Sequence, residues 1–147
     1  MRKRILLADD DADDRALFRE AVSEIDSTLF CHAVNNGDQA LRWLEQEIDR
    51  PDVIFLDVNM PVVTGWECIA QLKQKRELQH IPVIMYSTTS QKTHVNKALS
   101  LGALCLLTKP DSFQRIKEIL TKVISTRNTD LLDSIKIFPE VKWKVIQ

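Results

Sequence analysis

The sequence predicts an α/β protein with a doubly wound parallel sheet, in which helices cover both faces. Short apolar runs alternate five times with segments whose apolar residues recur at helical spacing. The apolar runs are continuous, which is typical of parallel strands buried on both faces. The length of 147 residues is that of one domain, and a chain of this size needs no disulfide or structural metal to fold.

The five expected strands are bounded by turn residues and charges. The first is the run Ile-Leu-Leu-Ala, and the third, Asp-Val-Ile-Phe-Leu-Asp, is the clearest because its apolar core ends in a carboxylate. The second ends in Asn-Asn-Gly, which is typical of a turn. In chain order the strands cover residues 5–8, 29–34, 52–57, 82–86 and 103–107.

A helical stripe of apolar residues follows each expected strand. The fourth helix is expected to stop at Gly102, a residue type that favours the position just after a helix. The third is expected to start at Gly65. The stripes run through residues 17–25, 37–48, 66–72, 95–101 and 113–124.

Composition and charge exclude several classes of protein. Twenty Lys and Arg residues against 21 Asp and Glu residues give a net charge of −1, which argues against a protein that coats nucleic acid. No apolar run approaches the roughly 20 residues that span a bilayer, and the start lacks the apolar segment of a signal peptide. Cys31, Cys68 and Cys105 form no CxxC pair. We therefore expect reduced thiols in a cytoplasmic protein.

Polar residues follow four of the five strands at the point where each strand ends. In a sheet of this kind the working site lies beyond the carboxyl ends of the strands. We therefore expect one crevice to contain residues from the groups Asp9 and Asp10; Asp57, Val58 and Asn59; Ser87, Thr88 and Thr89; and Thr108, Lys109 and Pro110.

The chemistry of this set points to a metal and a phosphoryl group. Carboxylates that share a crevice repel each other unless a cation lies among them, and oxygen ligands favour Mg²⁺ over Zn²⁺. The hydroxyl of Ser87 and the ammonium of Lys109 would complete a pocket for a dianion. Asp57 could then act as a nucleophile toward phosphorus. Taken singly, such residues are usually turn formers, helix caps or loop residues.

The acidic run continues beyond the first strand end. For Asp13 and Asp14 we favour a simpler interpretation, a solvated helix start. Carboxylates in this position are stabilised by the helix macrodipole.

As an ordered set, these motifs resemble the receiver domain of bacterial two-component response regulators. The resemblance runs from Arg4 to about Ser125 and includes Met60-Pro61-x-x-x-Gly65 and Lys109-Pro110. The stretch Asp-Asp-Asp-Ala-Asp-Asp-Arg is similar to that of stand-alone, CheY-like receivers, including those that pair with bacterial phytochromes. The resemblance implies a flavodoxin-like sheet of order 2-1-3-4-5, a receiver domain over residues 1–125 and a tail over residues 126–147.

The resemblance also implies roles at the acidic end of the crevice. Asp57 would be the phosphoacceptor. Asp9 and Asp10 would be the acidic pair that binds Mg²⁺ together with Asp57, with Asp10 a direct ligand and Asn59 contributing its backbone carbonyl. The side chains of Asn59 and Thr89 would tune the lifetime of the phosphoryl group.

At the other end, the resemblance implies a phosphoryl-binding and switching group. Ser87 would hydrogen-bond to the phosphoryl group and move with it, beside Thr88. Lys109 would form an ion pair with the phosphoryl group, and the Lys109-Pro110 peptide would be cis. The usual aromatic residue of the fifth strand is replaced by Leu106, so we leave open whether Leu106 takes over its switching role.

The implied function is signalling without classical enzymatic turnover. A sensor histidine kinase, a phosphotransfer protein or a small phosphodonor would phosphorylate Asp57 in a Mg²⁺-dependent reaction. This would bias a conformational equilibrium on the face made by the fourth helix, the fifth strand and the fifth helix. Output would pass through protein–protein contacts, with no direct DNA or membrane binding. A homodimer through that face or through the tail is possible.

Two interpretations of the tail stay open. Ile135 and Ile137 alternate, as do Val141, Trp143 and Val145. The tail is either mobile with a few anchoring contacts or a strand-like arm that docks on its own domain or on a second copy. It is too short for a DNA-binding output domain.

Two other functions compete with the receiver. A haloacid-dehalogenase-like phosphatase also uses a strand-end Asp and Mg²⁺, but it needs a second Asp where this chain has Asn59, which cannot donate a carboxylic proton. A degenerate receiver that binds partners without phosphorylation is the other alternative, although all key positions are filled.

Overall fold

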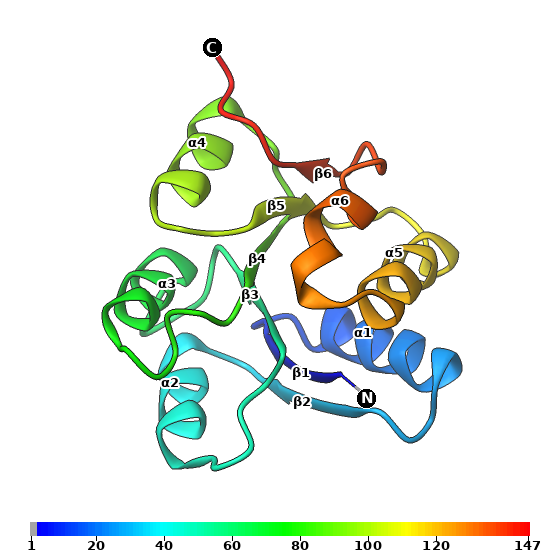
Figure 1. Ribbon diagram of the computed structural model, residues 1–147, viewed down its shortest axis with the longest axis horizontal. Helices are drawn as coiled ribbons and strands as arrows, with labels where there is room; N and C mark the ends of the chain where they lie inside the picture. Colours follow the sequence, from blue (N-terminus) through cyan, green and yellow to red (C-terminus); the bar gives the residue numbers. More distant parts are fainter. Residues whose placement is uncertain (1–2) are drawn as a thin grey trace.

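The computed structural model describes residues 3–147 and has one six-stranded sheet between two layers of helices (Figure 1). The sheet order is β2-β1-β3-β4-β5-β6, parallel except for β6, so the predicted order is confirmed. The strands are β1 (Arg4–Ala8), β2 (Phe30–Val34), β3 (Val53–Asp57), β4 (Val83–Ser87), β5 (Cys105–Thr108) and β6 (Val141–Lys142). The helices are α1 (Ala12–Ile25), α2 (Gly37–Gln46), α3 (Gly65–Gln74), α4 (Lys92–Ser100), α5 (Phe113–Ser125) and α6 (Leu131–Ile135), with a 3-10 turn, η1 (Asn128–Asp130).

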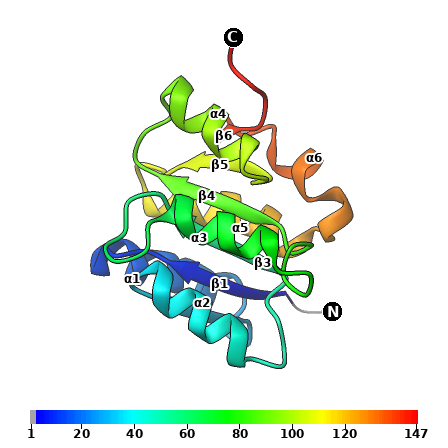
Figure 2. The same cartoon turned by 90° about the vertical axis from the view of Figure 1, so that its left-hand side faces the viewer.

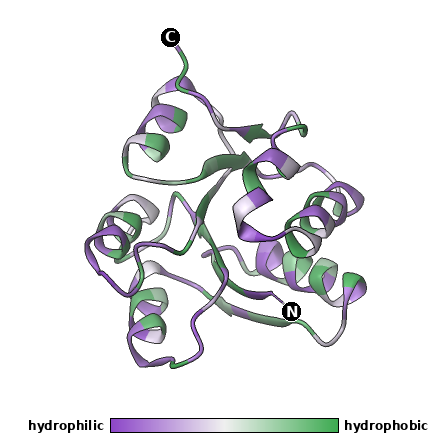
Figure 3. Cartoon of the chain, in the orientation of Figure 1, coloured by the Kyte–Doolittle hydropathy of each residue, from purple (hydrophilic) through white to green (hydrophobic). Residues whose placement is uncertain are grey.

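The central strands are apolar throughout because both of their faces are buried. In β1, Leu6 and Ala8 belong to the core under α2, α3 and α4, whereas Ile5 and Leu7 belong to the core under α1 and α5. Figure 1 shows the sheet between these two layers, and Figure 2 views it from the side of α2, α3 and α4, with the strands side by side behind these helices. Figure 3 shows that the strands are largely apolar. This explains why the strands lack the alternation of a half-exposed sheet.

Short polar side chains define where the helices begin. Asp11, Asn36, Thr64 and Ser112 are the N-caps of α1, α2, α3 and α5, and each accepts a hydrogen bond from a backbone N–H in the first turn. Gly102 follows α4 with φ of 96°, as expected of a residue that ends a helix.

Most element boundaries lie within one residue of the expected ones, and two differ by more. α2 ends at Gln46, so Ile48 lies beyond the helix and is exposed. β5 begins at Cys105 and not at Ala103, because the backbone N–H of Ala103 donates to the Ala98 carbonyl and completes the turn after α4. β4 and β5 end one residue later than expected, at Ser87 and Thr108, so these polar residues are the last of their strands.

The tail folds onto the domain. Leu131 and Ile135 of α6 and Val141 of β6 are buried in the same core as α1 and α5. Of the two interpretations, docking on the chain's own domain is therefore correct for this segment. The strand-like form of that interpretation does not hold for Ile135 and Ile137, because Ile135 lies in α6 and Ile137 is exposed after it.

Polar contacts fix the tail along the outer edge of β5. The Arg115 guanidinium contacts the Glu140 carboxylate at 2.7 and 3.1 Å, and Thr108 N–H donates to the Glu140 carbonyl at 2.9 Å. Further on, Asn96 of α4 forms two hydrogen bonds with the backbone of Ile146, at 2.9 and 2.8 Å. The tail thus spans β5 and reaches α4.

No helix within residues 3–147 is long and apolar enough to cross a membrane. The three cysteines are free thiols. Burial raises the pKa of Cys31 to about 11 and that of Cys68 and Cys105 to about 12, so none is a reactive thiolate near neutral pH.

Candidate functional site

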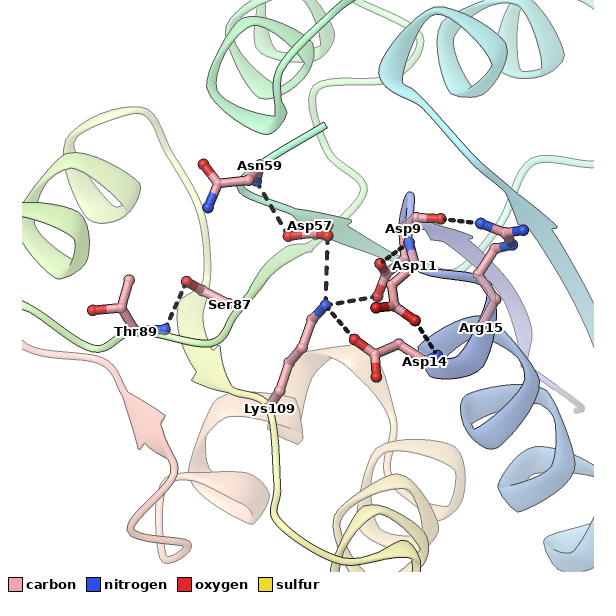
Figure 4. Close-up of polar contacts among 9 residues, drawn as sticks. All are labelled: Asp9, Asp11, Asp14, Arg15, Asp57, Asn59, Ser87, Thr89 and Lys109. Atoms are coloured by element: carbon pink, nitrogen blue, oxygen red, sulfur yellow. Dashed lines mark hydrogen bonds and ion pairs between the residues drawn. The ribbon is translucent and has the colours of Figure 1, made fainter. Parts of the chain in front are cut away.

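The carboxyl ends of β1, β3, β4 and β5 meet at one edge of the sheet, where the polar residues gather (Figure 4). Asp57 is the last residue of β3, and Ser87 is the last residue of β4. Asp57 pairs in register with Tyr86, and Ser87 pairs with Thr108. Residues far apart in sequence are therefore neighbours because of strand order alone.

The Lys109 ammonium lies at the centre of this edge. Its Nζ is 2.8 Å from Asp14 Oδ2, 3.0 Å from Asp9 Oδ2 and 3.5 Å from Asp57 Oδ2. The Lys109 backbone N–H donates to the Ser87 carbonyl at 2.7 Å, which fixes the start of the loop after β5. The positive charge is thus held directly beside the carboxylate at the end of β3.

The acidic pair after β1 divides into a buried and an exposed member. Asp9 is fully buried, and its Oδ1 accepts a hydrogen bond from Asp11 N–H at 3.0 Å. Its Oδ2 lies 3.0 Å from Lys109 Nζ as an ion pair and has no hydrogen-bond partner. Asp10 is exposed.

These carboxylates fit a hard divalent cation. Ligand oxygens of Asp9, Asp10 and Asp57 all lie within 4.8 Å of one another. Carboxylate oxygens are the ligands that Mg²⁺ and Mn²⁺ prefer, and the unbonded Asp9 oxygen is buried beside them. The three residues therefore form a site whose donor set suits such an ion.

Asp57 is buried and sits in an acidic environment. Its Oδ1 accepts a hydrogen bond from Asn59 N–H at 3.2 Å. Burial and then the Asp9 carboxylate raise the pKa of Asp57 to about 8, against the opposing influence of Lys109 and the Asn59 N–H. Without a metal, the ionised Asp57 is therefore disfavoured in the folded protein.

This predicts a pH-dependent effect of Asp57→Asn on stability. The pKa of Asp57 is about 8 in the folded protein and about 4 in an unfolded chain, so the stability that protonated Asp57 contributes is lost as pH rises from about 4 through 8. In a chelator, we expect the variant to be more stable than the wild type at pH 9, by on the order of 3 kcal/mol. At pH 5 most of this advantage should disappear. Urea unfolding at pH 5, 7 and 9 measures it, and a pH-independent difference would contradict this account.

The hydroxyl residues at the end of β4 and just after it lie on the side of the site away from Asp9 and Asp10. Ser87 is buried, and its Oγ accepts a hydrogen bond from Thr89 N–H at 3.1 Å. Thr88 is exposed. Asn59 contacts Asp57 through its backbone, and Figure 4 shows its side-chain amide directed away from Asp57. The predicted residues thus gather at this edge, with Ser87 the buried hydroxyl among them.

The loop between β3 and α3 is packed against the end of β3. Gly65 begins α3, which Thr64 and Glu67 cap reciprocally. A Cβ at Gly65 would lie 2.2 Å from the carbonyl oxygen of Asp57 and 2.9 Å from Cα of Val58. The backbone of α3 can approach the Asp57 peptide only because residue 65 has no side chain.

The expected cis peptide between Lys109 and Pro110 is wrong. No peptide bond among residues 3–147 is cis. The trans form is the lower-energy form of a bond before proline, and in it the Lys109 N–H still reaches the Ser87 carbonyl.

Asp14 lies in the candidate site, where the sequence did not lead us to expect it. The interpretation as a solvated helix start is correct for its place in the first turn of α1 but not for its side chain, which is the nearest carboxylate to Lys109. The sequence does contain a signal for this position. Asp14 lies in the first turn of the helix that directly follows the acidic pair at the end of β1, and that turn faces the same crevice. For Asp13, which is exposed, the simpler interpretation holds.

Leu106 and Tyr86 lie on opposite faces of the sheet. Leu106 is buried in the core under α4, whereas Tyr86 packs edge-on against Phe18 and Phe55 in the core under α1 and α5. Tyr86 therefore does not replace the aromatic residue that is usual at the position of Leu106, because it lies on the other face of the sheet.

Comparison with known proteins gives a consistent result. The response regulator receiver domain family matches residues 5–121. Response regulator Rcp1 of Synechocystis sp. is 34% identical over 114 residues, which cover 73% of this chain and 76% of Rcp1. A protein-glutamate methylesterase/protein-glutamine glutaminase of Syntrophomonas wolfei is 31% identical over 98% of this chain. This chain spans only 38% of that relative's length.

Solved structures agree with the sequence relatives. The Mn²⁺-bound form of Rcp1 superposes with a TM-score of 0.75 at 30% identity, covering 84% of this chain and 96% of that one. The phosphorylated cyanobacterial phytochrome response regulator RcpA also gives a TM-score of 0.75, at 29% identity over 82% of this chain and 90% of that one. Both the family match and the Rcp1 similarity cover most of the sequence, and the chain belongs to the response regulator receiver domain family.

Proposed function

We propose that this protein accepts a phosphoryl group on Asp57 in a Mg²⁺-dependent reaction and signals through protein–protein contacts. The donor would be the phosphohistidine of a sensor histidine kinase or of a phosphotransfer protein, or a small acyl phosphate. The observation that carries the proposal is the Lys109 ammonium, 3.5 Å from the buried strand-end carboxylate of Asp57, which with Asp9 and Asp10 forms a set that suits a divalent ion.

The chemistry follows from these positions. An Asp57 oxygen forms a bond to phosphorus while the bond from phosphorus to the donor nitrogen or oxygen breaks, and the imidazole or acetate leaves with the electron pair. Lys109 stays protonated, since its pKa is raised by the surrounding carboxylates, and its charge offsets that of the phosphoryl oxygens. Bound Mg²⁺, held by Asp9, Asp10, Asp57 and the Asn59 carbonyl, would supply further positive charge.

The signalling step rests on the residues around the phosphoryl group. Ser87, whose Oγ accepts a hydrogen bond from Thr89 N–H, would donate its O–H to the phosphoryl group, and the loop with Thr88 would follow. Asn59 and Thr89 would set the lifetime. The output surface would be the α4–β5–α5 face together with β6, which pairs with β5. Self-association through this face or the tail, a cytoplasmic location and output without direct DNA binding belong to the same proposal.

Incubation with acetyl phosphate tests the proposal by intact-mass spectrometry. We expect the wild type to gain one phosphoryl group with Mg²⁺ and none with a chelator. Asp57→Asn should gain none under either condition because it lacks the nucleophile. Asp111→Asn is the matched control, since Asp111 is exposed and follows Lys109-Pro110. An equal gain in Asp57→Asn, or no gain in the wild type with Mg²⁺, would contradict the assignment.

A further inference from the structure

Lys109 is bound more closely by Asp14 than by the proposed phosphoacceptor. The Nζ distances are 2.8 Å to Asp14, 3.0 Å to Asp9 and 3.5 Å to Asp57. The ammonium donates hydrogen bonds to Asp14 and Asp57, and the Asp9 carboxylate forms an ion pair with it. A phosphoryl oxygen that approaches Lys109 must therefore compete with a carboxylate already in place.

The scaffold of α1 holds Asp14 in this position. Its backbone N–H donates to the N-cap Asp11 at 3.0 Å, and Asp11 N–H donates to Asp9 Oδ1 at 3.0 Å. The Asp14 side chain is 34% exposed, whereas that of Asp9 is 0% exposed. Asp14 thus lies at the solvent side of Lys109, on the rim of the site (Figure 4).

We propose that Asp14 is a positioning residue that withholds part of the Lys109 charge from Asp57 and thereby slows phosphorylation by anionic donors. This inference rests on the proposed function. Asp14 competes for an N–H of Lys109, and its own negative charge repels an incoming phosphate dianion. The proton stays on Lys109 throughout, so only the direction of its hydrogen bonds changes when the phosphoryl group is bound.

Asp14 is not needed to keep Lys109 in the site. The ammonium also contacts Asp9 and Asp57, and it lies 5.3 Å from the centre of the Tyr86 ring. The Lys109 side chain is only 12% exposed. Loss of the Asp14 charge should therefore free the ammonium for the phosphoryl group without releasing it to solvent.

The test compares Asp14→Asn with Asp13→Asn, which removes the same charge one residue away. Asp13 is exposed and makes no ion pair with Lys109. With saturating Mg²⁺ and limiting acetyl phosphate, we expect Asp14→Asn to be phosphorylated about 3- to 10-fold faster than the wild type. Asp13→Asn should change the rate by less than about 2-fold. Asp14→Glu keeps the negative charge, so its phosphorylation rate should lie much closer to that of the wild type than to that of Asp14→Asn.

A second readout is independent of phosphoryl transfer. Beryllofluoride mimics a phosphoryl group on a carboxylate, and the rise in unfolding temperature that it causes reports its affinity. We expect tighter binding to Asp14→Asn than to Asp13→Asn, a result that a purely structural role of Asp14 would not give.

The outcomes separate the two proposals. A wild type that is phosphorylated on Asp57, with Asp14→Asn no faster than Asp13→Asn, overturns the role of Asp14 and leaves the proposed function intact. A slower Asp14→Asn also overturns it, because Asp14 would then be an anchor. If neither the wild type nor any variant is phosphorylated or binds beryllofluoride, the proposed function fails and this inference fails with it.

Discussion

Removal of residues 126–147 is expected to lower the free energy of unfolding by about 3 to 6 kcal/mol. Leu131, Ile135 and Val141 are 0%, 1% and 4% exposed. Burying such a side chain contributes roughly 1.5 to 3 kcal/mol, part of which is offset by the entropy lost when the tail is ordered. The Arg115–Glu140 ion pair would be lost as well. Because domains are stable by only about 5 to 15 kcal/mol, the truncated chain should be close to unfolding.

Urea unfolding followed by circular dichroism measures this effect. Two single substitutions in the full-length chain separate the loss of buried side chains from the loss of chain length. Leu131→Ala should cost about 2 to 5 kcal/mol, whereas Ile137→Ala should cost less than about 0.5 kcal/mol because Ile137 is 69% exposed. A truncated chain that unfolds at the wild-type urea concentration would mean that the tail is not part of the folded core.

Gly65→Ala is expected to damage both stability and phosphorylation. The new Cβ would meet the Asp57 carbonyl oxygen at 2.2 Å and Val58 Cα at 2.9 Å. Both are backbone atoms at the end of β3, so the clash cannot be relieved by a change of side-chain rotamer. We expect a loss of about 2 to 4 kcal/mol in stability. We also expect an at least roughly 10-fold slower reaction with acetyl phosphate, since a shift of about 1 Å at the nucleophile has effects of this size.

Gly102→Ala is the matched control. Its φ of 96° disfavours alanine, but the nearest atoms to a new Cβ, at 3.4 Å, belong to the flexible Lys73 side chain. It should cost about 1 to 2 kcal/mol from backbone strain and leave the phosphorylation rate unchanged. If both glycine variants lose the same stability and keep the same rate, the close approach of α3 to Asp57 has no functional consequence.

The parallel sheet could be predicted from sequence because its signals are local. An apolar run such as 53–56 needs burial on both faces wherever it lies, and strand ends meet at one edge whatever the loops do. For this reason Asp57 and Lys109, 52 positions apart, could be placed together before their contact was known.

Features that depend on side-chain direction could not be predicted in the same way. Asp13 and Asp14 are identical in type and adjacent, but only Asp14 faces Lys109, because the turn of α1 directs the two side chains differently. In the tail, the alternation of Ile135 and Ile137 suggested a strand. The helix formed instead, because packing of Leu131 and Ile135 against α5 determines the conformation of so short a segment. The division into residues 1–125 and 126–147 remains a proposal that the truncation addresses.

Borohydride reduction of the phosphorylated protein identifies which residue carries the phosphoryl group. An aspartyl phosphate is an acyl phosphate, and hydride reduces it to the alcohol with release of phosphate, which converts the phosphorylated residue to homoserine. Peptide mass spectrometry after acetyl phosphate and Mg²⁺ should find homoserine at position 57 and at no other aspartate. Homoserine at another position, or a phosphoryl group that resists reduction and remains on a hydroxyl residue, would contradict the assignment of Asp57 as the phosphoacceptor.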